Sequence, residues 1–171
     1  MSVERNSETV ERIEMGRLDL ALAWGQPVGP FAERLTELPI RWIGPTQRDF
    51  GRHADEPLPL IAFELQCDFR AAGIIALDAA DIPRGLVFSS PSLAGLWAAV
   101  AAGLGVSLRT PAGLPNSVWA LDPQEAGLPP LPEIAQSLYK ADTELSPAVP
   151  LLASILRDTL VETLEVFENL P

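Results

Sequence analysis

Cysteine and histidine are almost absent from this chain, which has one of each, Cys67 and His53, among 171 residues. A single cysteine excludes an intramolecular disulfide. One cysteine and one histidine also fall short of the ligand set of a zinc site. We therefore expect no disulfide, no metal site and no cofactor. The first sixteen residues lack the basic and apolar segments of a secretory signal, so we expect a cytoplasmic protein.

Basic residues are also scarce, with 12 Lys and Arg against 23 Asp and Glu and a net charge of -11. The arginines are scattered singly from Arg5 to Arg157. Nucleic-acid binding relies on clustered Lys and Arg that neutralise phosphates. We therefore expect this chain alone not to bind DNA.

Long apolar runs are missing as well, since no stretch approaches the length of about 18 apolar residues that spans a membrane. The hydrophobic content of 47% and the charged content of 20% are those of a globular protein. The composition thus predicts one domain, or two small lobes, without a membrane segment.

The apolar periodicities predict an alternation of strands and helices. A Gly- and Pro-rich crossing over 25–31 and a polar loop over 45–57 interrupt it. A short extended piece is expected at 2–5. The expected strands are residues 18–24, 39–44, 58–63, 85–90, 106–110, 117–121 and 136–142, and the expected helices are residues 8–15, 67–80, 93–102 and 146–167.

Residues 58–110 read as strand, helix, strand, helix and strand with tight connections, which predicts a parallel sheet covered by helices. The second of these helices has one apolar face, made of Leu93, Leu96, Trp97, Val100 and Leu104. The last helix has an apolar stripe that we expect to dock on the sheet, made of Val149, Leu152, Ile155, Leu156, Leu160 and Leu164.

Five phrases in this order resemble the effector-binding domain of LysR-type transcriptional regulators: GRLDLALAW, LTELPIRWIG, EPLPLIAFELQCDFR, VFSSPSLAGLWAAVAAGLGVSLRT and LSPAVPLLASIL. Together they span nearly the whole chain, and the segment SPSL…AAVAAGLGV is the most specific of them. The resemblance implies an α/β, two-lobe, periplasmic-binding-protein-like (type II) fold with a small effector in the cleft. It also implies that the winged helix-turn-helix of the family is absent from this chain.

The resemblance further implies how the lobes are divided. Lobe one holds residues 1–25 and 145–171, and lobe two holds residues 26–144. Lobe one is expected to be incomplete, because the strand and helix that precede this region in the family have no counterpart here. Uncovered apolar sheet surface would then favour association.

A serine cluster, Ser89, Ser90 and Ser92, lies where a strand ends and the helix from Leu93 begins. Ser92 is expected to cap that helix with its side chain. The first-turn N–H groups attract anions, and ligands of open α/β sheets sit at such strand ends. The cluster is therefore a structural cap, a ligand contact or both, and Leu93 adjoins it.

Four further side chains are candidates for the cleft: Phe63, Cys67, Phe69 and Trp24. Cys67 is otherwise a small buried hydrophobe, and a redox role would need a second cysteine. Arg109, like Arg70, could pair with an acidic effector, although surface ion pairing is the simpler explanation. His53 is expected in a solvated loop, and no catalytic residue is assigned because no nucleophile elbow is present.

These expectations point to the ligand-sensing domain of a LysR-type regulator rather than to an enzyme. The effector would be a small molecule such as an organic or aromatic acid, and the chain would form a homodimer. DNA would be contacted only through a winged helix-turn-helix outside this chain. Two alternatives remain: the solute-binding protein of a transporter, or a truncated interaction module without ligand binding.

Overall fold

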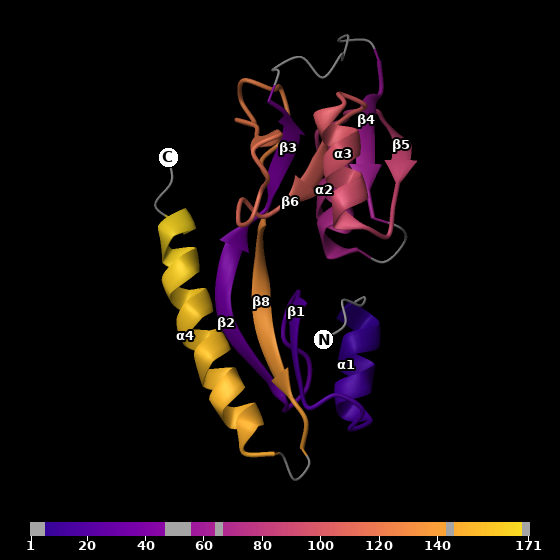
Figure 1. The fold of residues 1–171 in the computed structure, drawn as a ribbon. Helices are drawn as coiled ribbons and strands as arrows, with labels where there is room; N and C mark the ends of the chain where they lie inside the picture. The colour runs from indigo at the N-terminus through magenta and orange to yellow at the C-terminus, as the bar shows by residue number, and fades with distance from the viewer. Residues whose placement is uncertain (1–5, 47–55, 64–66, 143–145, 169–171) are drawn as a thin grey trace. The chain divides into compact units, whose positions relative to one another are not determined.

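The computed structural model describes residues 6–46, 56–63, 67–142 and 146–168. The chain divides into two compact units: unit 1 holds Met1–Leu38 and Glu133–Pro171, and unit 2 holds Pro39–Pro132. The extended piece expected at 2–5 and the loop with His53 lie outside the described residues. Figure 1 shows the elements of each unit.

Unit 1 is built around the strand β8 (Glu133–Lys140), which is central in a three-stranded sheet of order β1-β8-β2. β1 (Leu20–Trp24) pairs antiparallel with β8, from Leu20 opposite Lys140 to Trp24 opposite Gln136. β2 (Ala32–Pro39) is the other neighbour. The helices of this unit are α1 (Asn6–Glu14) and α4 (Ala148–Glu168).

The expected lobe boundaries differ from those of the units. Residues 26–38 and 133–144, which the sequence analysis assigns to lobe two, belong to unit 1. The reason is sheet pairing, because β2 and β8 share a sheet with β1. β2 is also an element that the apolar periodicity did not predict.

Unit 2 contains the parallel core of the molecule. β4 (Leu58–Ala62) pairs in parallel with β5 (Arg84–Ser89), and Leu60 also bridges in parallel to Val106, just before β6 (Ser107–Arg109). The connecting helices are α2 (Asp68–Ala79) and α3 (Leu93–Ala101). The expectation of alternating strands and helices over 58–110 is thus confirmed.

A second, antiparallel sheet of order β6-β3-β7 completes unit 2. β3 (Arg41–Pro45) and β7 (Val118–Ala120) form it with β6. One core cluster joins the two sheets through α3, and it contains Ile43, Ile61, Leu96, Val100 and Val118. Phe63 and Trp97 pack against this cluster, so the end of β4 is tied to a rigid core.

Close backbone packing also fixes the position of β6. A Cβ atom on Gly105 would lie 2.3 Å from the carbonyl oxygen of Pro59 in β4. Only glycine allows this approach, which places the segment leading into β6 directly against β4. The turn before it needs Gly103, whose φ is +74°, to end α3 as the sequence predicts.

Two expected apolar faces are only partly buried. Leu96 and Val100 of α3 are buried, but Leu93 at its start and Leu104, which follows its end, are exposed. The apolar face is therefore buried only in its middle. In α4, Leu152 is 48% exposed and Ile155 is 52% exposed. Ala153 is buried in their place, because a neighbouring face of the helix meets the sheet.

The described part of the chain contains no helix that combines the length and the apolar character needed to cross a bilayer.

Candidate functional site at the carboxyl edge of unit 2

The carboxyl ends of three parallel segments meet at one edge of unit 2. β4 ends at Ala62, β5 at Ser89 and β6 at Arg109. The chain leaving β5 stays close to the end of β4, since the N–H of Ser90 donates to the carbonyl of Ala62 at 3.4 Å. Because ligands of open α/β sheets bind outside the carboxyl ends of the strands, this edge is the candidate site.

Arg109 lies at the centre of the edge, against aromatic rings. Its guanidinium carbon is 4.2 Å from the ring centroid of Phe63 and 4.6 Å from that of Phe69. Its Nη1 donates to the carbonyl of Leu108 at 3.0 Å and lies 3.9 Å from the Sγ of Cys67. The structure thus brings together Phe63, Cys67, Phe69 and Arg109, all four of which the sequence analysis names separately.

These residues line a shallow depression that encloses no space for a water molecule, and Arg70 and Ser107 also contribute to it. Burial there lowers the pKa of the Arg109 guanidinium, and the Cys67 sulfur opposes that shift. An arginine keeps its proton in proteins. The depression therefore holds a partly desolvated positive charge.

No carboxylate pairs with this charge among the described residues, whose ion pairs are Arg34–Glu37, Arg84–Asp78 and Arg157–Glu33. Among the described residues, surface ion pairing of Arg109 is therefore not observed. A buried charge is normally paired. Arg109 is instead held by two rings, a thiol and one carbonyl, which leaves it suited to an anion from outside.

The serine cluster forms the second part of the edge, with a different geometry from the one expected. Ser92 is the N-cap residue of α3, but its side chain makes no capping hydrogen bond. The Oγ of Ser90 instead accepts the N–H of Ser92 at 3.1 Å. Gly95 makes room for it, because a Cβ there would lie 2.7 Å from that oxygen. The prediction that the Ser92 side chain caps the helix was wrong.

The hydroxyl of Ser92 is consequently available at the surface, together with the exposed side chains of Ser89 and Leu93. The N-cap residue of α2, Cys67, also makes no side-chain capping bond. Both helices therefore begin at this edge without a side-chain cap. Their first-turn N–H groups add positive potential at the same place as Arg109.

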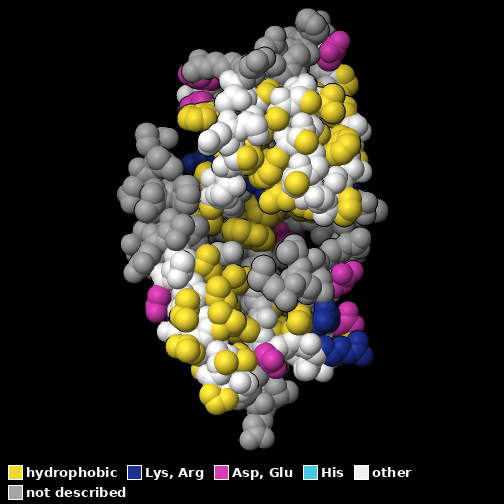
Figure 2. Space-filling view, in the orientation of Figure 1, with side chains coloured by type: hydrophobic (Ala, Val, Ile, Leu, Met, Phe, Trp, Pro, Cys, Tyr) yellow, Lys and Arg dark blue, Asp and Glu magenta, His cyan; other side chains and the backbone are white. Residues whose placement is uncertain are grey.

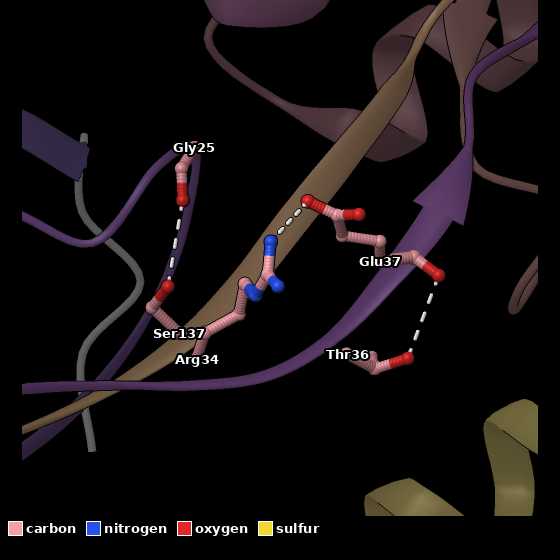
Figure 3. Close-up of polar contacts among 5 residues, drawn as sticks. All are labelled: Gly25, Arg34, Thr36, Glu37 and Ser137. Carbon is pink, nitrogen blue, oxygen red and sulfur yellow. Dashed lines mark hydrogen bonds and ion pairs between the residues drawn. The ribbon is translucent and has the colours of Figure 1, made fainter.

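Trp24 lies in unit 1, where it is the half-buried last residue of β1. Its part in the site stays a prediction. Within unit 1 (Figure 3), the Oγ of Ser137 donates to the carbonyl of Gly25 at 3.4 Å, and Arg34 pairs with Glu37 at 2.6 Å. The Oε1 of Gln136, the residue opposite Trp24 in the β1–β8 pair, is buried without a hydrogen-bond partner among the described residues.

A larger cavity of about 420 Å³ lies in unit 1, where Phe31, Leu138 and Ala153 line it together with the charged Glu33 and Arg157. Those two charges neutralise each other, since Arg157 binds both carboxylate oxygens of Glu33 at 3.0 and 2.6 Å. Size alone favours this cavity, but unpaired charge favours the edge of unit 2. An anionic ligand gains binding energy from an unpaired charge and none from volume alone, so the edge of unit 2 remains the candidate site.

One cation close to the site was not named by the sequence reasoning. Arg41, the first residue of β3, is the direct cross-strand partner of Arg109. It lies inside a predicted strand, but no local pattern reveals which residue of a distant strand will face it. Among the described residues, no three His, Cys, Asp or Glu side chains gather to hold a metal ion.

Comparison with known sequences identifies a family. A family model described as the LysR substrate binding domain matches residues 1–161. The chain is 27% identical over 152 residues to the HTH-type transcriptional regulator PecT of Dickeya dadantii (strain 3937). This alignment covers 87% of the chain and 47% of PecT. The chain therefore spans about half the length of that relative.

Solved structures agree on the fold. The bromide-bound regulatory domain of HypT from Salmonella typhimurium matches with a TM-score of 0.73 and 16% identity, covering 93% of this chain and 80% of that one. The regulatory domain of CcmR from Synechocystis PCC6803, in complex with 2-PG, matches with a TM-score of 0.64 and 15% identity, covering 92% and 81%. The expected periplasmic-binding-protein-like fold is thus confirmed.

Proposed function

Because the chain belongs to the LysR substrate-binding domain family, we propose that it is the ligand-sensing part of a LysR-type transcriptional regulator and binds a small effector at the carboxyl edge of unit 2. The carrying observation is the partly desolvated charge of Arg109, which has no carboxylate partner among the described residues. The family match favours this reading over a transporter's solute-binding protein. We propose no catalytic role.

The proposed mechanism is a shift between conformations. A ligand changes the balance between two states only by binding one of them more tightly. The chain passes between its two units twice, at Leu38–Pro39 and at Pro132–Glu133. We infer that effector binding favours one arrangement of the units. We place the resulting regulator in the cytoplasm, with DNA contact through a helix-turn-helix region that this chain does not match.

We also propose that the domain forms a homodimer through β5. Within the described residues β5 has one strand neighbour, β4, and its Leu86 and Val87 are 47% and 54% exposed. Figure 2 shows hydrophobic side chains gathered over the part of unit 2 that contains α2, α3, β4 and β5. An apolar edge strand of this kind readily pairs with another chain. Sedimentation should show a dimer that Val87→Lys weakens, and an unchanged dimer would contradict this interface.

A thermal-shift screen tests the sensing function. The panel would contain anionic, neutral and cationic metabolites, applied to the wild type, Ser92→Ala and the control Ser117→Ala. A ligand at 100 times its Kd stabilises the folded state by about 2.7 kcal/mol. We expect a hit that stabilises the wild type and Ser117→Ala equally and Ser92→Ala less. Equal stabilisation of all three would refute the serine contact, and the absence of any hit would refute ligand sensing.

A further inference from the structure

The hydrogen-bond donors of Arg109 are only partly used. A guanidinium has five N–H donors in a planar fork. Both of its hydrogen bonds to described residues come from Nη1, one to the carbonyl of Leu108 and one to the sulfur of Cys67. Nε and Nη2 have no acceptor among the described residues. These two nitrogens form one edge of the guanidinium, and no described residue occupies that edge.

The free edge is open to a ligand. Among the described residues, the Oε1 of Gln136 is the one side-chain N or O atom that is fully buried without a hydrogen-bond partner. Nε and Nη2 of Arg109 are therefore not sealed inside the protein. Because Phe63 and Phe69 lie against the guanidinium, the direction that remains for a hydrogen-bond acceptor lies in the plane of the fork.

A second cation faces the same side of the sheet. Arg41 and Arg109 are directly opposite each other in the antiparallel β3–β6 pair, and directly opposed side chains lie on one face. Arg41 forms no ion pair among the described residues. Like charges at opposed positions destabilise a sheet. An anion bound at this face would relieve that repulsion.

We propose that the effector carries a planar carboxylate, which binds edge-on to Nε and Nη2 of Arg109 in two parallel hydrogen bonds. Carboxylates match the Arg fork in this bidentate way. The aromatic rings hold the fork in place before the ligand arrives. This inference rests on the proposed function, because it names the ligand class of the same site.

The test compares two isosteric pairs on the full chain: acetate with acetamide, and phenylacetate with phenylacetamide. The ¹⁵N–¹H signal of the Arg109 Nε reports directly on the proposed bond. We expect acetate and phenylacetate to shift this signal saturably at constant ionic strength, and both amides to leave it unchanged. Arg109→Lys, which keeps the charge but lacks the fork, should bind phenylacetate with intermediate affinity.

Arg109→Gln should weaken the Kd for phenylacetate by about 10- to 100-fold, as expected for hydrogen bonds to a charged group. Arg41→Gln is the matched control, because it removes the same charge from the facing strand without touching the fork. It should weaken binding by less than about threefold. Circular dichroism melting of each variant confirms that it is folded. Equal losses in both variants would overturn recognition by the fork.

The outcomes separate this inference from the proposed function. If a neutral or cationic compound stabilises the chain while both carboxylates leave the Arg109 Nε signal unchanged, the sensing function stands and carboxylate recognition is wrong. If no compound of any class binds, both are wrong. If carboxylates bind but Arg109→Gln binds them as tightly as the wild type does, the assigned anchor is wrong.

Discussion

Arg157 in unit 1 and Arg109 in unit 2 differ in whether a carboxylate neutralises their charge. In unit 1, Arg157 is exposed and bound to both oxygens of Glu33, which raises its pKa. In unit 2, Arg109 lies against two rings and a thiol without a carboxylate, and burial lowers its pKa. Unit 1 neutralises its own charge, whereas unit 2 leaves a charge unpaired where desolvation makes that unfavourable.

The difference indicates where a ligand contributes binding energy. An exposed pair such as Arg157–Glu33 adds little to stability and attracts a third charge weakly. A buried cation without a partner lowers the stability of the folded state. It therefore gains more interaction energy from a bound anion than an exposed, paired arginine does. The smaller depression in unit 2 is therefore the better candidate than the larger cavity in unit 1, and the following changes test that contrast.

The largest effect is expected from Gly105→Ala, which attacks the backbone packing that places Arg109. The new Cβ would meet the Pro59 carbonyl oxygen at 2.3 Å, so β4 and β6 must separate. Overpacking of this kind destabilises by about 2–3 kcal/mol. Urea unfolding would measure it. Gly85→Ala is the control, since no atom lies within 4 Å of its added Cβ, and equal stability of the two variants would contradict the prediction.

Cys67→Asp would give Arg109 the partner it lacks and make unit 2 resemble unit 1. Cys67 is the N-cap of α2, and its sulfur lies 3.9 Å from Nη1 of Arg109. Asp and Ser are similarly good N-caps, so Cys67→Ser is the matched control. We expect Cys67→Asp to be more stable than Cys67→Ser by about 1.5 kcal/mol in thermal unfolding, because of the charged hydrogen bond.

The same substitution should weaken the response of the Arg109 Nε signal to acetate, because the new carboxylate neutralises the charge that attracts the anion. Combining it with Arg109→Gln should remove the gain in stability. A Cys67→Asp variant that is no more stable than Cys67→Ser would show that the guanidinium is not within reach of this position.

The next effect separates two neighbouring serines at the edge. Ser90→Ala removes the acceptor of the Ser92 N–H and should destabilise by about 1 kcal/mol. Ser92→Ala should change stability by less than about 0.3 kcal/mol, because this exposed N-cap side chain makes no capping bond. Chemical denaturation measures both. The reverse order would restore the usual rule that the N-cap residue itself supplies the cap.

Much of unit 2 could be predicted from the sequence because its signals are local. The run from Leu58 to Thr110 shows its strands and helices through apolar period, glycine stops and short connections. The residue types at the edge, such as Arg109 and Cys67, could be named for the same reason. Their convergence could not be predicted, because it depends on β6 lying beside β4, which a bridge between Leu60 and Val106 sets.

The errors share one physical cause: non-local partners decided the outcome. β2 escaped prediction because its partner β8 follows it by about a hundred residues along the chain, and its own sequence, AERLTELP, has no strong apolar period. The cap of α3 was mispredicted because the Ser92 side chain makes no capping bond, while the Ser92 N–H donates to Ser90, for whose side chain Gly95 leaves room. In α4, spacing alone did not reveal that Ala153 is buried while Leu152 is exposed.

The smallest effect is expected in unit 1, where the paired arginine can be removed. The hydrogen bond from Arg157 holds the pKa of the Glu33 carboxyl below its ordinary value, burial opposes this, and the charges of Arg157 and Lys140 lower it further. A carboxyl whose folded-state pKa is lowered stabilises the protein above its unfolded pKa. This contribution is lost as the pH falls through the folded-state pKa.

Arg157→Gln should therefore raise the pKa of Glu33, as measured by ¹³C NMR titration of its carboxyl carbon. The stability that the pair contributes above the unfolded pKa of Glu33 should disappear with it. Arg34→Gln is the control. Arg34 follows Glu33 in β2 but pairs with Glu37, so its removal leaves the Arg157–Glu33 pair in place. Added salt should weaken the effect, since both partners are exposed to solvent. An unchanged Glu33 titration in Arg157→Gln would mean that unit 1 does not neutralise its own charge, and the contrast with Arg109 would no longer hold.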